Sequence, residues 1–166
     1  MLNLKIGEHV HYGTHGVCQV CGMESKTFGR ERRMYFTLQP VGRENILLYL
    51  PEDADPEKVH LRPVLSREEI LELIRESHDM EVRWISDSKQ RKEAFSRVIR
   101  SGDARELFRM LKTIRARQEE LAGAKQLPMS DQELQQSARR QLYSELSYVL
   151  GIEEKDVFAY IMSVDR

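Results

Sequence analysis

Cysteine and long apolar runs are scarce in this chain, and each shortage excludes a class of protein. Only two of the 166 residues are cysteines, so the chain cannot be a small secreted domain built on a disulfide framework. The longest apolar run, residues 46–50, is far shorter than the roughly twenty residues that cross a bilayer. The first residues have no signal-peptide core. We therefore expect a cytoplasmic protein that does not contact a membrane.

Motifs that carry catalysis are also missing. There is no nucleophile elbow, no phosphate-binding loop and no HExxH sequence. The adjacent pairs Glu68-Glu69 and Glu153-Glu154 fall where first helical turns are expected, and there they favour the positive end of the helix dipole. We expect a protein that is not an enzyme and that has no cofactor and no small-molecule substrate.

The apolar pattern changes near Pro63 and divides the chain into two predicted parts. Before Pro63, short alternating runs separated by glycine and proline are typical of strands; after it, apolar residues recur every three or four positions, as in helices. We predict an α+β protein, with a small Tudor- or SH3-like β-barrel over residues 1–63 and a compact helical bundle over 64–166. The predicted strands are 8–12, 16–24, 34–39, 45–50 and 58–61.

Capping signals mark the predicted helices. A serine or aspartate followed three residues later by glutamate satisfies backbone N–H groups at a helix start, and this pattern occurs at Ser66, Asp103 and Ser130. Gly102 and Gly151 are placed to end two helices in the left-handed conformation. A second helix is expected to contain residues 94–99, and a short last one residues 157–162.

Cys18 and Cys21 form a CxxC sequence, with His9, His11 and His15 upstream. Zinc needs four such ligands in a tetrahedron, so a zinc site is formally conceivable. In a continuous strand, however, residues three apart point to opposite faces, so the two thiols are expected to diverge. The alternative is a pair of small apolar residues in a strand, which we prefer, and we predict no metal site.

A basic run lies between Arg83 and Arg117, where eleven Lys or Arg face four Asp or Glu, a local net charge of +7 in a chain of net charge -1. Such a patch can bind nucleic-acid phosphates, and its alternative is a solvated helix face. Trp84, the only tryptophan, is either a core residue or an exposed wedge that stacks on unpaired bases. The candidate DNA-binding residues are Arg83, Trp84, Lys89, Arg91, Lys92 and Arg97.

With these residues in place, nearly the whole chain resembles the CarD family of bacterial RNA polymerase-binding transcription regulators. The resemblance rests on residues 5–12, on His15-Gly16-Val17, on Leu50-Pro51 and on residues 61–64, with Tyr35 and Leu38 between them. In the helical part it rests on Ser101-Gly102-Asp103 and the long helix that follows. The β-module is similar to the one in the transcription-repair coupling factor, whose ATPase motors this chain lacks.

The resemblance implies specific partners and contacts. The Tudor-like module of such proteins docks on the RNA polymerase β subunit by strand-edge pairing, and Lys26, its neighbour Thr27 and Tyr49 stand at the corresponding positions. The helical module contacts promoter DNA at the upstream edge of the bubble, without sequence specificity, through a tryptophan in the minor groove. In family members that tryptophan stands where this chain has Ser88, so Trp84 is displaced by four residues, close to one helical turn.

We therefore predict a non-enzymatic regulator that binds RNA polymerase β and promoter DNA and modulates open-complex stability. Two other interpretations remain from the residues alone. One is a protein-interaction adaptor whose helical half never touches DNA. The other is a zinc-binding module built on Cys18 and Cys21. Steep salt dependence of target binding favours the regulator over the adaptor, since phosphate contacts weaken as salt rises.

Overall fold

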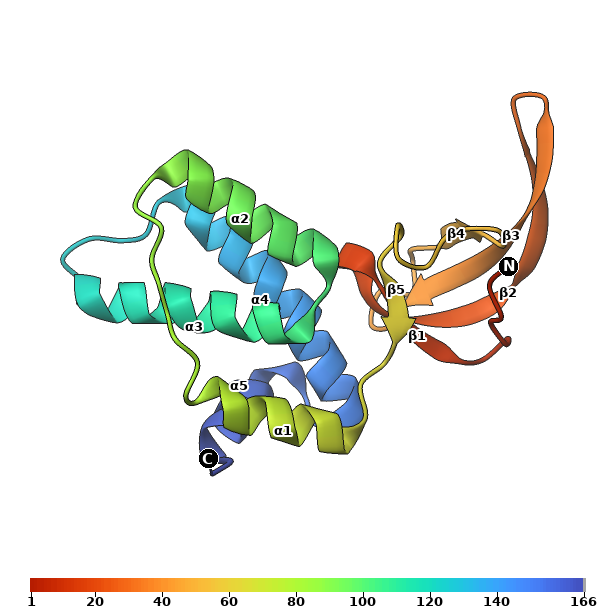
Figure 1. The fold of residues 1–166 in the computed structure, drawn as a ribbon. Helices are drawn as coiled ribbons and strands as arrows, with labels where there is room; N and C mark the ends of the chain where they lie inside the picture. The colour runs from red at the N-terminus through yellow and green to blue at the C-terminus, as the bar shows by residue number, and fades with distance from the viewer. Residues whose placement is uncertain (166) are drawn as a thin grey trace. The chain divides into compact units, whose positions relative to one another are not determined.

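The computed structural model describes residues 1–165 and divides the chain into two compact units (Figure 1). The first unit runs from Met1 to Val64, and the second begins at Leu65. The first consists of strands and the second of helices, so the α+β class is confirmed.

The N-terminal unit, here called the β-unit, is a five-stranded antiparallel sheet with the strand order β4-β3-β2-β1-β5. Its core contains Val10, Cys18, Val20, Phe36, Leu38 and Leu50. A single 3-10 turn, Gly13–His15, joins the first two strands. The strands are β1 (His9–Tyr12), β2 (Gly16–Phe28), β3 (Glu31–Pro40), β4 (Leu48–Pro51) and β5 (Leu61–Pro63).

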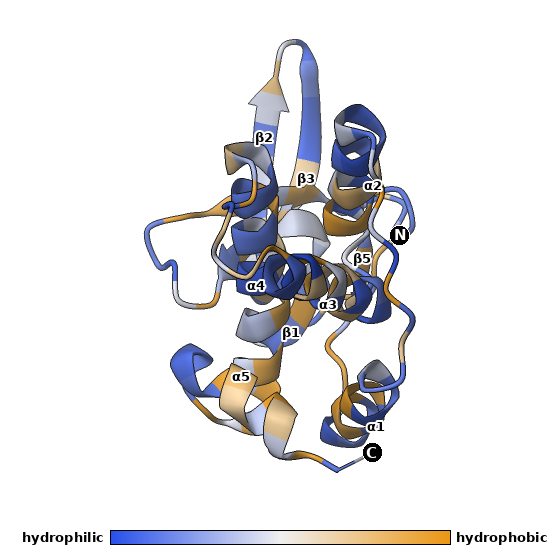
Figure 2. Ribbon diagram, turned by 90° about the vertical axis from the view of Figure 1, so that its left-hand side faces the viewer, coloured by the Kyte–Doolittle hydropathy of each residue, from blue (hydrophilic) through white to orange (hydrophobic). Residues whose placement is uncertain are grey.

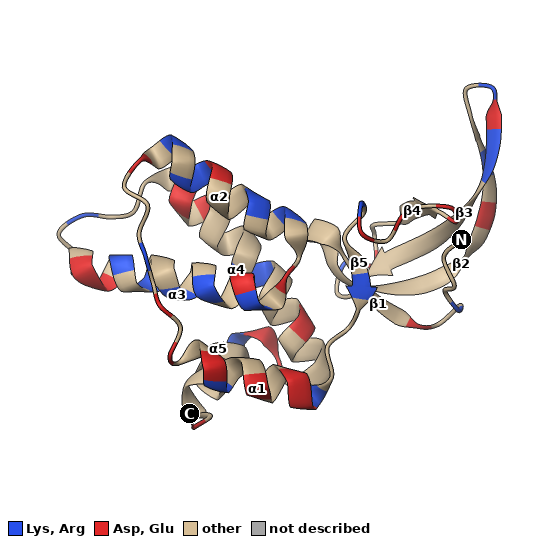
Figure 3. Cartoon of the chain, viewed as in Figure 1, with Lys and Arg blue, Asp and Glu red and all other residues tan. Residues whose placement is uncertain are grey.

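The second and third strands are longer than their apolar pattern predicted. Residues 28–32 were expected to form a hairpin tip outside the strands, but the pairing continues as far as Phe28 and Glu31. Gly29, at φ +66°, makes the turn. The result is a hairpin whose far end carries mostly charged side chains (Figure 3).

The last strand lies later in the chain than predicted. Residues 58–60 were expected to contribute most of it, but they belong to a series of turns: the Asp55 side chain accepts a hydrogen bond from the Glu57 backbone N–H, and the Leu61 N–H donates to the Pro56 carbonyl. Asp followed by Pro favours such a turn. Pairing with β1 begins only at Leu61.

The helical unit has one hydrophobic core, to which all five helices contribute side chains. The fully buried side chains in it include Ile70, Ile74, Leu107, Ile114, Leu142 and Leu146. No helix in residues 1–165 combines the length and the apolar character that crossing a membrane requires. The helices are α1 (Arg67–Ser77), α2 (Ser88–Ser101), α3 (Ala104–Leu121), α4 (Met129–Leu150) and α5 (Glu154–Ser163).

Most of the predicted helix ends are confirmed. Ser66 and Glu69 form a capping box, and the Asp103 side chain accepts from the Glu106 N–H. Gly102 and Gly151 end α2 and α4 in the left-handed conformation.

The predicted capping box at Ser130 is wrong. Helix α4 begins at Met129 and has Pro128 as its N-cap, with no side-chain cap. The Pro128 carbonyl accepts hydrogen bonds from the backbone N–H groups of Asp131 and Gln132, so the first hydrogen bonds of the helix are made to the N-cap residue. Asp131 is thereby placed in the first turn of α4, where its carboxylate is 2% exposed.

Candidate functional site

The outer edge of β2 is open in the β-unit. Strand β1 pairs with β2 only from Gly16 to Gln19, whereas β3 pairs with β2 as far as Phe28. Within residues 1–165, no strand therefore covers the other edge of β2 from Gly22 to Phe28. An uncovered edge offers backbone N–H and C=O groups to an added strand, which is a recurrent way of binding a protein.

Lys26 and Tyr49, predicted from the resemblance alone, lie together on one face of the sheet. The Lys26 ammonium nitrogen is 3.8 Å from the centre of the Tyr49 ring. A side-chain hydrogen bond with Tyr49 is the main cause that raises the pKa of Lys26, so the lysine stays charged. Thr27 is exposed and, as the next residue in the strand, points to the opposite face.

Sequence reasoning missed two aromatic residues beside this pair. Tyr35 packs edge-on against Tyr49, with ring centres 6.4 Å apart, and against Phe28, with ring centres 5.5 Å apart. Phe28 is 59% exposed at the end of β2. These contacts depend on the register between strands, which the spacing of residues within one strand does not give.

The two cysteines do not converge, as their spacing predicted. Cys18 is fully buried in the β-unit core, where burial raises the pKa of its thiol to about 12. Cys21 is exposed at the point where the register between β2 and β3 shifts. A thiol that stays protonated and a second one outside the core do not fit a zinc knuckle, which needs two adjacent thiolates.

The cations of the basic run fall into two groups: those that bond to an acidic side chain or to backbone carbonyls, and those that have no ion-pair partner among the described residues. On α3, Arg105 pairs with Glu76 and Arg109 with Glu106, while Lys112 donates to three backbone carbonyls. On α2 the exposed cations have no ion-pair partner among residues 1–165, and Glu93 is the only acidic residue of that helix. These unpaired residues, here called the α2 basic face, are Lys89, Lys92, Arg97 and Arg100 (Figure 3).

Arg91 departs from the prediction that it contacts DNA. It is 5% exposed and forms two hydrogen bonds with Asp131, Nε to Oδ1 at 2.9 Å and Nη2 to Oδ2 at 2.8 Å. Its Nη1 donates to the Ile85 carbonyl at 2.9 Å. The reason is helical spacing: Arg91 lies four residues before Phe95 and therefore faces the core. The Arg91 guanidinium thus links α2, α4 and the segment that precedes α2 through its hydrogen bonds.

Trp84 lies in the irregular segment between α1 and α2, and it is partly buried. Its ring packs against Phe95, with ring centres 6.2 Å apart. The guanidinium carbons of Arg91 and Arg117 lie 4.4 Å and 5.5 Å from the ring centre. Trp84 thus anchors the segment to the helical core, and part of the indole still reaches solvent. Trp84 therefore has a core contact, as in the interpretation of a core residue, and an exposed part, as in the interpretation of a wedge.

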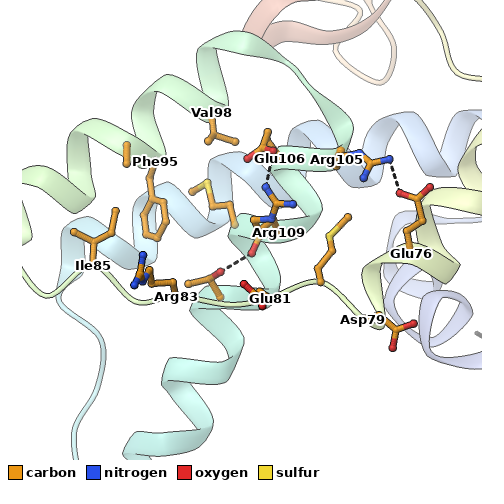
Figure 4. A pocket seen from close by; sticks show the side chains of 14 residues that line it. Glu76, Asp79, Glu81, Arg83, Ile85, Phe95, Val98, Arg105, Glu106 and Arg109 are labelled. Carbon is orange, nitrogen blue, oxygen red and sulfur yellow. Dashed lines mark hydrogen bonds and ion pairs between the residues drawn. The ribbon is translucent and has the colours of Figure 1, made fainter.

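A groove of about 840 Å³ separates this segment from α2 and α3 (Figure 4). Phe95 and Val98 contribute apolar side chains to it, and Arg83 is exposed at its rim. Arg105 and Arg109 also line it, but both are paired with glutamates. The lining carries four acidic and three basic side chains, so the groove itself is a poor site for a polyanion. Arg83, at its rim, has no ion-pair partner within residues 1–165.

Two family profiles match the chain. The profile of the CarD-like/TRCF RID domain matches residues 4–65, and that of the CarD C-terminal domain matches residues 69–162. The chain belongs to the CarD family. CarD-family domains of this kind occur in RNA polymerase-interacting transcription regulators. The two matches meet within a few residues of the division between the two units. A comparison with curated proteins gave no match.

Proposed function

We propose that this CarD-family protein regulates transcription by holding RNA polymerase with one unit and promoter DNA with the other. The β-unit binds the polymerase β subunit, and the helical unit contacts DNA at the upstream edge of the bubble, changing the lifetime of the open complex. The observation that carries the DNA contact is the α2 basic face, because its cations lack the acidic partners that occupy their neighbours on α3.

A chain with a net charge of -1 binds naked DNA weakly, so the polymerase contact has a physical role in this proposal. Tethering by the β-unit raises the local concentration of the α2 basic face near DNA, and a few phosphate contacts then suffice. Phosphate contacts carry no sequence information, so the promoters affected are selected by the polymerase. The regulator shifts the promoter equilibrium only by its difference in affinity for melted and closed DNA.

Charge reversal beside the open edge of β2 tests the polymerase contact. We expect Lys26→Glu to weaken binding to RNA polymerase by about tenfold or more, because it replaces the ammonium over Tyr49 with a carboxylate. Binding to naked promoter DNA is expected to stay unchanged. The measurement is surface plasmon resonance with immobilised polymerase core enzyme.

Lys58→Glu is the matched control. Lys58 is exposed in the same unit, in the turns before β5, the end strand that pairs with β1 and not with β2, and its reversal changes the net charge equally. Equal losses of polymerase binding in the two variants would assign the effect to overall charge and would contradict docking at the β2 edge.

The exposed part of Trp84 is proposed to contact the melted edge of the promoter. Base stacking on an aromatic ring contributes about 1–3 kcal/mol, and the exposed part of Trp84 can make it while the ring stays packed against Phe95. We expect Trp84→Phe to keep the packing on Phe95 and polymerase binding but to shorten the open-complex lifetime. We expect Trp84→Ala to destabilise the fold as well, by about 2 kcal/mol. An unchanged lifetime with Trp84→Phe would contradict an indole contact.

A further inference from the structure

A second surface of the helical unit has the features of a binding groove and is used by neither proposed contact. Two adjoining hollows of about 570 Å³ and 580 Å³ lie between α3, α4 and α5, and the first also reaches Ser77 and His78 at the end of α1 and Val82 beyond it. They share four lining residues, Arg115, Arg139, Tyr143 and Phe158, and are here called together the α3–α5 groove. None of its lining residues belongs to α2 or to the β-unit.

Helix α5 presents apolar side chains on two faces. Val157 and Ile161 are buried in the core of the helical unit. Phe158 and Met162, four residues apart and thus on one side of the helix, are 37% and 58% exposed in the groove. Figure 2 shows α5 in predominantly apolar colours. A helix that keeps apolar residues on its solvent side is typical of a protein-binding surface.

Arginines form the rim of these apolar side chains. Arg139 and Arg140 are exposed on α4 and make no ion pair within residues 1–165. Arg115 lies with its guanidinium carbon 4.0 Å from the centre of the Phe158 ring. Glu119 and Glu154 also line the groove, but Glu119 is already paired with Arg115, and the unpaired charges of the rim are dominated by cations.

We propose that the α3–α5 groove binds an acidic amphipathic helix of a partner protein. Apolar side chains of that helix contact Phe158 and Met162, and its carboxylates pair with Arg139 and Arg140, whose planar guanidinium groups suit bidentate contacts. A nucleic-acid backbone is complementary in charge to the arginines, but it has no apolar groups that would cover the exposed side chains of Phe158 and Met162. Anchors at i, i+4 and i+7 span about 10 Å and follow the helix-in-groove mode of recognition.

The test uses a defined probe, a fluorescein-labelled 16-residue helical peptide with leucine at i, i+4, i+7 and i+11 and glutamate on the flanking positions. The full-length protein is expected to raise its fluorescence anisotropy saturably. A peptide with lysine in place of each glutamate is expected to bind at least tenfold more weakly. Equal binding of the two peptides, or no binding of the acidic one, overturns the proposal.

Variants locate the site. We expect the double substitution Arg139→Glu/Arg140→Glu to weaken peptide binding at least tenfold, and Met162→Glu to do the same by removing an exposed apolar contact. Lys89→Glu/Lys92→Glu, with the same charge change on α2, is expected to leave peptide binding unchanged. Melting curves verify that each variant is folded, and Met162→Glu serves as the second test if the arginine variant is not.

The outcomes also separate this inference from the proposed function. If Arg139→Glu/Arg140→Glu weakens binding to promoter DNA rather than to the peptide, the groove is a nucleic-acid site and the inference is wrong. If sedimentation shows self-association that Met162→Glu abolishes while the peptide does not compete, the occupant is a second copy and the inference is again wrong. Loss of DNA binding in the α2 variant alone concerns only the proposed function.

Discussion

Arg91→Ala is expected to destabilise the protein by about 3–5 kcal/mol, which is the usual cost of removing one partner of a buried ion pair. Asp131, which is 2% exposed beside Arg91, would lose the cation that compensates its carboxylate. The Ile85 and Ser86 carbonyls would also lose their donor, which frees the segment that carries Trp84. Urea unfolding followed by Trp84 fluorescence measures the effect, and the variant's midpoint is expected to fall sharply.

Arg97→Ala is the control, because Arg97 is exposed on the same helix and forms no ion pair within residues 1–165. Its free energy of unfolding is expected to change by no more than about 0.5 kcal/mol. The double substitution Arg91→Met/Asp131→Leu is expected to recover much of the lost stability, since apolar residues often replace a buried pair without cost. If Arg91→Ala is as mild as Arg97→Ala, the pair does not hold the helices together.

Lys89→Glu/Lys92→Glu is expected to reduce the affinity of the protein for duplex promoter DNA by tenfold or more. Each lysine that contacts a phosphate releases counterions, so the plot of log affinity against log salt should become shallower by about two units when two contacts are lost. Stability is expected to change little, because both side chains are exposed and have no ion-pair partner among residues 1–165. Anisotropy titrations of labelled duplex at several salt concentrations measure both quantities.

Arg139→Glu/Arg140→Glu is the matched control for this experiment. It changes the net charge by the same amount within the same unit, but its two residues lie on α4 and not on α2. Its DNA affinity and salt slope should match those of the unsubstituted protein. Equal losses in both variants would show that DNA responds to the total charge of the unit and would contradict a localised contact on α2.

Local signals in the sequence predicted most of the helical unit. Ser66 with Glu69, Asp103 with Glu106, and Gly102 act within one turn of the chain, so short-range patterns are enough to identify them. The family resemblance pointed to Lys26 and Tyr49 as separate positions, and the structure shows the Lys26 ammonium nitrogen 3.8 Å from the centre of the Tyr49 ring. Their partner protein remains part of the proposal.

The differences arise where partners are distant in sequence. Arg91 looked like one more cation in a basic run, because its partner Asp131 lies forty residues later. The i, i+4 relation to Phe95 was the available signal that Arg91 faces inward. Similarly, the open edge of β2 depends on where β1 stops pairing with it. The rim of the α3–α5 groove depends on how three helices pack together. Neither can be deduced from the spacing of residues within one element.

The lifetime of open promoter complexes tests the central claim most directly. RNA polymerase from the same organism is measured with and without saturating protein, and binding of the protein to the polymerase is verified in the same sample. The account predicts that the unsubstituted protein changes the lifetime and that Lys89→Glu/Lys92→Glu, though still bound to polymerase, does not. An unchanged lifetime with the bound, unsubstituted protein would contradict the account and leave an adaptor that uses the polymerase only as a dock.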